Sequence, residues 1–316
     1  MKIKHINNIF KLFRGFICDF YLYCKAVYSS KYQRQQLIRD MMLIGHSLEK
    51  GMFFKDKKQE WGQQKAVRLT RLIEKYYNCD YELCPEIISA VNILNAYKSD
   101  TFASKNSELQ TKINRILSGY ESLLEEGRAG IKKVSCPKQF DKNEIMRFFQ
   151  TRSSVRDFSD IPLSEKEIDN ALEIAYLTPS ACNRQSSKVY AVRNKQLIKE
   201  FLSLQLGDQG WCESADTLFL ITGNMSCFGG VNERHQVYID GGMFAMNFVM
   251  GLHLVGIASC FKMFVRDPKV QGQVNLLFNI PQNEVPIVCV FAGHYKQEPV
   301  NDPVSYRIKK KVNIIN

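Results

Sequence analysis

The sequence lacks several patterns that would assign a function directly. Its 316 residues include ten cysteines, but no Cys-x-x-Cys pair and no histidine beside a cysteine at zinc spacing. No apolar run reaches the roughly 18–20 residues that span a bilayer. The five histidines are scattered, no Ser–His–Asp arrangement can be argued from them, and no Gly-x-Gly-x-x-Gly occurs. We therefore expect no metal site, no membrane-spanning segment and no side-chain nucleophile.

The N-terminus also lacks the layout of a cleavable secretory signal. A chain of this length does not need disulfides to be stable. We interpret the cysteines as reduced thiols, mostly small buried side chains, and expect a cytoplasmic protein.

Charge divides the chain into two parts. Residues 1–140 carry 24 Lys and Arg against 14 Asp and Glu, whereas residues 141–316 carry 19 against 18. The basic half fits an anionic partner such as a membrane surface or a nucleic acid, and equally fits solvated helix surfaces. It contains no base-stacking aromatic motif, so we expect no nucleic-acid partner.

The spacing of apolar residues predicts different secondary structure in the two parts. Apolar residues at helical spacing over 32–52, and helical stretches near 61–78, 86–97 and 106–126, predict an all-helical region over residues 1–135. A Gly- and Pro-containing linker follows at Gly127–Lys138. Buried strands alternate with capped helices beyond it, which predicts an α+β domain over residues 140–316.

The first helical stretch is rich in aromatic residues. Phe10–Tyr23 is too interrupted by charge to cross a bilayer. It could lie in a membrane interface with Lys11, Arg14 and Lys25 facing the headgroups, or it could pack on the protein's own core.

Two polar clusters could bind a ligand. Thr151–Phe158 places two guanidiniums and two serine hydroxyls in one loop, a set suited to phosphate, although an exposed turn would look the same. Thr178–Gln185 carries two side-chain amides that suit the edge of a planar heterocycle, although an ordinary polar turn is the alternative. A third segment, Gly251–Cys260, ends a helix in small residues that would let the backbone approach a ring, or that simply cap the helix.

Taken together, these segments resemble the FMN-dependent nitroreductase family. The resemblance rests on Arg152–Phe158, Pro179–Gln185, Gly256–Cys260 and the run Val285–Tyr295, with Asp240–Asn247 similar to the start of the family's central helix. It covers about residues 144–310. It implies an α+β nitroreductase-like FMN-binding sandwich, a mixed sheet flanked by helices, preceded here by the all-helical region.

The resemblance also implies a set of cofactor-binding residues. By this resemblance, one cluster of residues would hold the phosphate and the ribityl chain of FMN. A second segment, supplied by the neighbouring subunit, would lie beside the flavin ring. Further residues would contact the edge of the flavin ring, and another would cover the phosphate. These implied residues are Arg152, Ser153, Ser154 and Arg156 for the first cluster, Pro179, Ser180, Asn183 and Gln185 for the second, Ser259 and Met263 at the ring edge, and Arg307 over the phosphate.

The implied protein is a homodimer with FMN at its interface. NADH or NADPH would deliver hydride to flavin N5, and a nitro, quinone or enone acceptor would take it, so no catalytic side chain is implied. Two segments depart from the family pattern: Gln185-Ser186-Ser187 replaces Gln-Pro-aromatic, and Phe261–Phe264 stands where Pro-x-Glu-Gly is common. The alternative function is therefore a flavin-binding, non-catalytic interaction protein recruited to a membrane-bound glycan assembly.

The basic half shows a further likeness. His46–Met52 resembles a segment that precedes nitroreductase-like domains in proteins of polysaccharide biosynthesis. It implies a role in such a pathway, with peripheral contact at the inner membrane face. A solvated helix face ending at Gly51 is the alternative.

Overall fold

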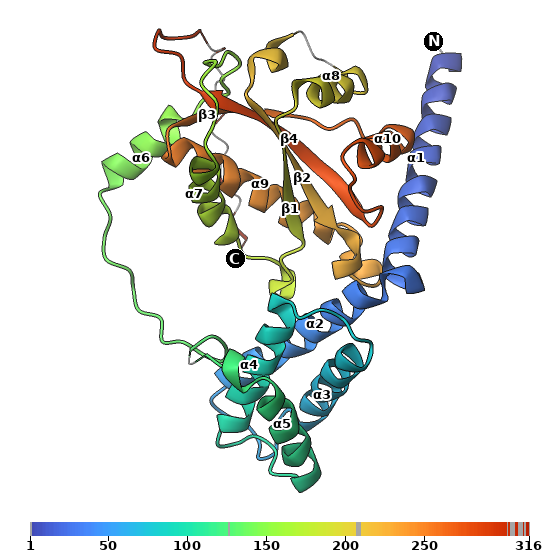
Figure 1. Ribbon diagram of the computed structural model, residues 1–316, viewed down its shortest axis with the longest axis vertical. Coiled ribbons are helices and arrows are strands. Elements are labelled where there is room, and N and C mark those ends of the chain that lie inside the picture. Colours follow the sequence, from blue (N-terminus) through green and yellow to red (C-terminus); the bar gives the residue numbers. More distant parts are fainter. Residues whose placement is uncertain are drawn as a thin grey trace.

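The computed structural model describes residues 2–125, 127–206, 210–301, 303, 307, 308, 312, 314 and 315, with the side chains of residues 2–4 excepted. Five helices precede the first strand-containing part of the chain (Figure 1). They are α1 (Lys2–Tyr28), α2 (Gln33–Phe53), α3 (Gln63–Asn78), α4 (Pro85–Ser99) and α5 (Ser107–Gly119). The helical reading of this region is confirmed.

Helices α2–α5 share one core. Its buried side chains run from Leu37 on α2 to Leu117 on α5. Helix α2 also contacts the second part of the chain, because the Arg39 guanidinium donates to the Phe228 carbonyl at 3.2 Å. The described residues between Leu124 and Asp141 form no helix or strand, as expected of a linker.

The described residues of the second part form five α-helices and four strands, besides short 3-10 helices. They are α6 (Lys142–Thr151), α7 (Glu165–Tyr176), β1 (Ser187–Val192), α8 (Lys195–Ser203), β2 (Thr217–Asn224), α9 (Gln236–Leu254), β3 (Ile257–Lys262), α10 (Pro268–Leu277) and β4 (Glu284–His294). Helix α7 begins with the predicted capping box, in which Ser164 and Glu167 satisfy each other's backbone N–H groups. Strand β3 was not predicted.

The four strands pair in the order β1-β2-β4-β3, and every pairing is antiparallel. The α+β class is thus confirmed, and the described sheet is antiparallel throughout rather than mixed. Alternate residues of β2 face opposite layers: Phe219 and Ile221 pack under α7 and α9, while Leu218 and Leu220 join the core with α8 and α10. The sheet therefore lies between two helical layers.

A buried carboxylate ties three strands together. Glu284 of β4 accepts hydrogen bonds from Lys188 at 2.5 Å, Tyr190 at 2.9 Å and Thr222 at 3.0 Å. Burial, and then the neighbouring carboxylate, raise the pKa of Tyr190. The donors offset the cost of burying the charge, so we assign this cluster a structural role.

In the described part of the chain, no helix combines the length and apolar character needed to cross a membrane. Helix α1 packs only partly on the protein: Ala26 and Val27 near its end are buried, while most of its earlier side chains are exposed.

Candidate functional site

The arginine–serine segment lies along the edge of the sheet. Helix α6 ends at Thr151, and the chain then runs beside β3, where the Val155 N–H donates to the Ser259 carbonyl at 3.1 Å. Two residues later the segment joins the end of β4, because Asp157 forms an ion pair with Lys296 at 2.6 Å. The structure therefore brings the predicted phosphate cluster and Ser259 together.

The two arginines of this segment differ in their surroundings. Arg152 is half-buried, and among the described residues its guanidinium forms no ion pair or hydrogen bond. It lies near Tyr295, whose pKa is raised by burial while the Arg152 charge opposes the shift. Arg156 is exposed, donates to the Ser154 carbonyl at 2.9 Å and lies 5.7 Å from the centre of the Trp211 ring. Arg152 is therefore a half-buried cation for which the described residues supply no hydrogen bond or ion pair.

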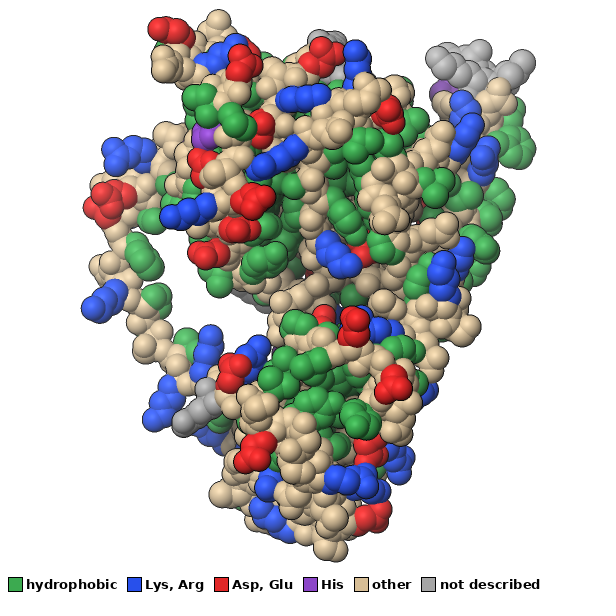
Figure 2. All heavy atoms as spheres, viewed as in Figure 1, with side chains coloured by type: hydrophobic (Ala, Val, Ile, Leu, Met, Phe, Trp, Pro, Cys, Tyr) green, Lys and Arg blue, Asp and Glu red, His purple; other side chains and the backbone are tan. Residues whose placement is uncertain are grey.

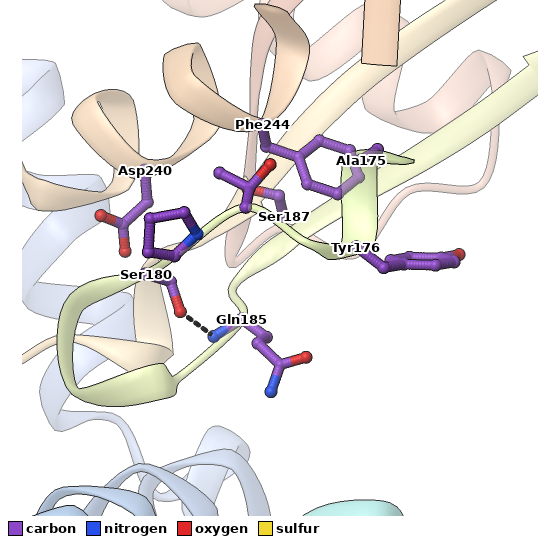
Figure 3. Close-up of a pocket in the computed structure, with 9 residues that line it drawn as sticks. Ala175, Tyr176, Ser180, Gln185, Ser187, Asp240 and Phe244 are labelled. Atoms are coloured by element: carbon purple, nitrogen blue, oxygen red, sulfur yellow. Dashed lines mark hydrogen bonds between the residues drawn. The ribbon is translucent and has the colours of Figure 1, made fainter. Parts of the chain in front are cut away.

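The second cluster forms a tight turn after α7. The Ser180 hydroxyl accepts a hydrogen bond from the Gln185 backbone N–H at 2.9 Å (Figure 3). The Ala181 N–H donates to the buried Asp240 carboxylate of α9 at 3.0 Å. Within this turn Cys182, Asn183 and Gln185 have φ values of 51°, 53° and 46°. Left-handed backbone at three side-chain-bearing residues is costly, and such conformations concentrate at functional sites.

An ion pair inside the protein holds this turn. Arg184 is almost fully buried, and its guanidinium donates two hydrogen bonds to Glu233 at 3.0 and 2.6 Å. It lies 4.8 Å from the centre of the Phe228 ring. Burial alone would lower the pKa of Arg184, but the Glu233 carboxylate outweighs it and raises that pKa. Arg184 is therefore committed to structure, unlike Arg152.

A small pocket opens between the turn and α9 (Figure 3). Its volume is about 100 Å³. Ligand pockets usually measure about 300–1,000 Å³, so this one is a fraction of a site. It is lined by Ala175, Tyr176, Thr178, Pro179, Ser180, Gln185, Ser187, Asp240 and Phe244.

The two clusters lie at opposite ends of α9. The turn is bonded to Asp240 in the second turn of that helix, whereas the Thr151 hydroxyl lies 3.1 Å from the imidazole of His253 in its last turn. Residues 240 and 253 are separated by about 20 Å along a helix that rises 1.5 Å per residue. A single subunit therefore does not bring the predicted phosphate cluster next to the predicted ring-contact cluster.

The remaining predicted residues are placed separately. Ser259 is buried in β3, Met263 is exposed just beyond it, and Arg307 is exposed in the chain that follows β4. Asn183 and Pro179 belong to the turn described above, and the predicted roles of all these residues stay predictions.

The two departures from the family pattern have structural roles here. Ser186 is buried, its carbonyl accepts the Asn224 N–H at 2.9 Å, and its hydroxyl has no partner among the described residues. Lys262 is also buried, and its ammonium donates to the Leu206 carbonyl at 2.7 Å. Phe264 is buried against the ring of Phe201. Both segments are used to build the core.

Sequence reasoning named Asp240 only as part of Asp240–Asn247 and did not predict which residues hold the turn. Asp240 binds the turn and accepts a second hydrogen bond from Gln236 at 2.7 Å. A charged residue inside an otherwise apolar helix was the available signal. The Arg184–Glu233 pair had none, because its members are 49 residues apart.

The His46–Met52 segment contributes to packing. A Cβ on Gly51 would lie 2.1 Å from the Trp61 ring, so this position requires glycine. Met52 is buried, and His46 lies 3.6 Å from the Glu49 carboxylate. These contacts account for Gly51 and Met52 without a ligand.

Comparisons with known proteins agree on one family. The nitroreductase family model matches residues 149–209. A relative from Archaeoglobus fulgidus, provisionally named an NADH dehydrogenase/NAD(P)H nitroreductase, is 25% identical over 158 residues, which are 49% of this chain and 87% of that protein. A similarly named relative from Methanothermobacter thermautotrophicus is 20% identical over 160 residues, which are 50% of this chain and 81% of that protein.

Shorter and structural matches carry related names. The FMN reductase [NAD(P)H] of Bacillus subtilis is 28% identical over 78 residues, which are 25% of this chain and 31% of that protein. A solved nitroreductase family protein from Streptococcus pneumoniae is 22% identical, with a TM-score of 0.44 over 52% of this chain and 96% of that one. Residues 149–209 match the nitroreductase family model, and about half of the chain is similar in sequence to relatives that carry the nitroreductase name.

Proposed function

We propose that this protein is an FMN-dependent oxidoreductase that takes hydride from NADH or NADPH and passes it to a small organic acceptor of the nitro, quinone or enone type. The family domain supports the reaction class. The observation that carries the cofactor assignment is Arg152, a half-buried cation with no partner among the described residues, set beside two serine hydroxyls.

The residues present fit the phosphate of FMN. A partly buried cation gains from a nearby anion, and guanidinium groups bind phosphate through paired hydrogen bonds. Arg152 and Arg156 would hold the phosphate, and the exposed Ser153 and half-buried Ser154 would complete the contact with hydroxyl donors. Arg307 would close over it from the chain beyond β4.

A second copy of the chain would complete the site. The turn at Pro179–Gln185 lies about 20 Å from the arginine segment of its own subunit, by the rise of α9. We infer that each subunit contributes its turn to its partner's cofactor, forming a homodimer. Helix α9 has an exposed apolar stripe at Ile239, Met243 and Met246, the spacing of a helix face that packs against another surface.

The bound flavin supplies the redox chemistry, and the protein supplies position and surroundings. Met263, just beyond the end of β3, and Ser259, within that strand, would lie nearest the ring edge. The tight turn, held by Asp240 and Arg184, would present Pro179, Asn183 and Gln185 as a fixed wall that excludes water from one side. The natural acceptor would stack in the space that the nicotinamide leaves.

One specific observation favours a second function. Lys262 is bonded to the Leu206 carbonyl within the core, and the segment that ends at Phe264 has no Glu-Gly. A segment packed into the core in this way also fits a protein that binds FMN without catalysing a reaction and is recruited to a glycan assembly. Such a protein would bind FMN and leave NADH and NADPH unoxidised.

We further propose a place for the protein in polysaccharide biosynthesis, in the cytoplasm. The His46–Met52 resemblance supports the pathway. The spacing of the ten cysteines, with no Cys-x-x-Cys pair, supports a reducing compartment. Disruption of the gene should alter the surface polysaccharide of the cell, and unchanged polysaccharide would argue against the pathway.

The test of the cofactor site is an FMN titration of the apo-protein followed by flavin fluorescence. Removing a charge-assisted phosphate contact costs about 1.5–3 kcal/mol, so Arg152→Ala should raise the Kd roughly 10- to 150-fold. Arg71→Ala, which removes an exposed arginine of α3, is the matched control and should leave the Kd unchanged. Equal affinities for both variants would contradict the proposed phosphate site.

A further inference from the structure

Helix α1 is fixed to the second part of the chain by its C-terminal half (Figure 1). The Tyr23 hydroxyl donates to the Gly230 carbonyl at 2.8 Å. The Ala26 carbonyl accepts the Ser226 hydroxyl at 2.8 Å. These contacts determine which face of the helix points toward the protein.

Helix α1 packs few large apolar side chains on the protein, and these, Leu22, Tyr23 and Val27, lie in its last two turns. Gly15, Cys18, Leu22 and Ala26, spaced by three, four and four, are half-buried or buried and lie along one stripe. Asp19 borders this stripe, and burial raises its pKa while the Arg266 charge opposes the shift. A helix docked for stability normally buries its most apolar face, and this one does not.

The opposite face carries large apolar side chains in solvent. At 100° per residue they cover about half of the helix circumference. Figure 2 shows hydrophobic side chains along the outer edge of this helix. The members, each 51–68% exposed, are Ile6, Ile9, Phe10, Leu12, Phe13, Phe16, Ile17, Phe20 and Tyr21.

Positive charge accompanies this apolar face. Lys11 and Arg14 are exposed on the remaining part of the circumference, and Lys25 lies on the same side one turn before the end of the helix. Asp19 is the only acidic residue of α1. A wide apolar face rich in phenylalanine with a basic polar face is the pattern of helices that lie in the plane of a membrane interface.

We propose that α1 is an in-plane membrane anchor that inserts its apolar face into the surface of a bilayer containing anionic phospholipid. The basic residues would then lie at the headgroups, where each contributes to attraction. Because α1 is bonded to the body of the protein, the membrane would also orient the flavin domain. This inference does not require the proposed reaction.

A second copy of the chain is the competing occupant, and the width of the apolar face disfavours it. A helix pair buries a narrow seam of about two residues in seven, whereas this face is much wider. An anionic lipid surface matches both the width and the charge.

The test is co-sedimentation of the flavin-loaded, full-length protein with vesicles. Vesicles rich in phosphatidylglycerol should sediment the protein, more added salt should weaken the binding, and pure phosphatidylcholine vesicles should bind it less. The double variant Phe13→Ser/Phe16→Ser removes two rings from the centre of the apolar face. Its partition coefficient should fall about 100-fold, at roughly tenfold for each ring.

The control is Phe53→Ser/Phe54→Ser, which removes two exposed rings at the end of α2 and should bind vesicles like the unchanged protein. Flavin content, measured in the same samples, should be equal in both double variants, which separates this inference from the cofactor proposal. Equal vesicle binding by the two double variants would overturn the anchor. So would an oligomer that only Phe13→Ser/Phe16→Ser dissociates, without vesicle binding, because a second copy would then cover the face.

Discussion

The ion pair between Arg184 and Glu233 should be a main stabiliser of the turn after α7. Its members differ in exposure: the Arg184 side chain is 1% exposed, and the Glu233 side chain is 28% exposed. Two hydrogen bonds join them, and the Glu233 carboxylate also accepts the Gly229 N–H at 2.7 Å. The effect of a substitution should therefore depend on which partner remains.

Removing the carboxylate should be the more damaging change. Glu233→Ala leaves a buried guanidinium unpaired, which costs about 3–5 kcal/mol in comparable pairs. Arg184→Met leaves a carboxylate that can reach water, and the loss should be about 1–3 kcal/mol. In the double variant no charge is stranded, so its destabilisation should be smaller than the sum by about 2–3 kcal/mol.

The assay is urea unfolding of the four proteins, unchanged, single and double variants, followed by far-UV circular dichroism and by tryptophan fluorescence. If the two probes give the same unfolding transition, the free energy of unfolding can be calculated from a two-state model. Additive losses, or a larger loss for Arg184→Met than for Glu233→Ala, would refute the reasoning.

Two further predictions concern packing and pH. Gly251→Ala should destabilise by about 2 kcal/mol or more in thermal unfolding, because its Cβ would lie 2.3 Å from the Ala171 carbonyl oxygen. Gly242→Ala, in the same helix with open space around it, should be neutral or stabilising, and equal losses would contradict the close approach of α7 and α9. Burial alone would raise the pKa of Glu233, but the Arg184 hydrogen bonds outweigh it and lower that pKa from 4.5. The ionised Glu233 carboxylate should therefore stabilise the fold fully above pH 4.5, and this stabilisation should be lost as the pH falls through the folded pKa. Between about pH 5 and pH 3, the urea midpoint of Glu233→Ala should consequently fall less than that of the unchanged protein.

Local signals predicted most helices of this fold. The capping box at Ser164 and Glu167 marked the start of α7, and the apolar spacing over 32–52 matched α2 to within one residue. Strand β3 was missed because Ile257–Lys262 is short and contains small residues with little strand preference. It forms through pairing with β4, as when Ser259 pairs with Ala292, and such long-range pairing is invisible in a local pattern.

The site was predictable in its parts and less so in its arrangement. The arginine–serine segment and Ser259 are brought together by one backbone hydrogen bond. The distance between this segment and the turn at Ser180 follows from how α7 packs on α9, which no motif encodes. The amphipathic character of α1 was readable from sequence, but which face points outward was fixed only by distant contacts such as that of Tyr23 with Gly230.

The most direct test of the central claim is an absorbance spectrum of the purified protein before and after anaerobic addition of NADH, repeated with NADPH. We expect an oxidised flavin spectrum that bleaches with at least one of the two nucleotides. A colourless protein that refuses added FMN would contradict the cofactor site, and a bound flavin that neither nucleotide reduces would contradict the proposed reaction.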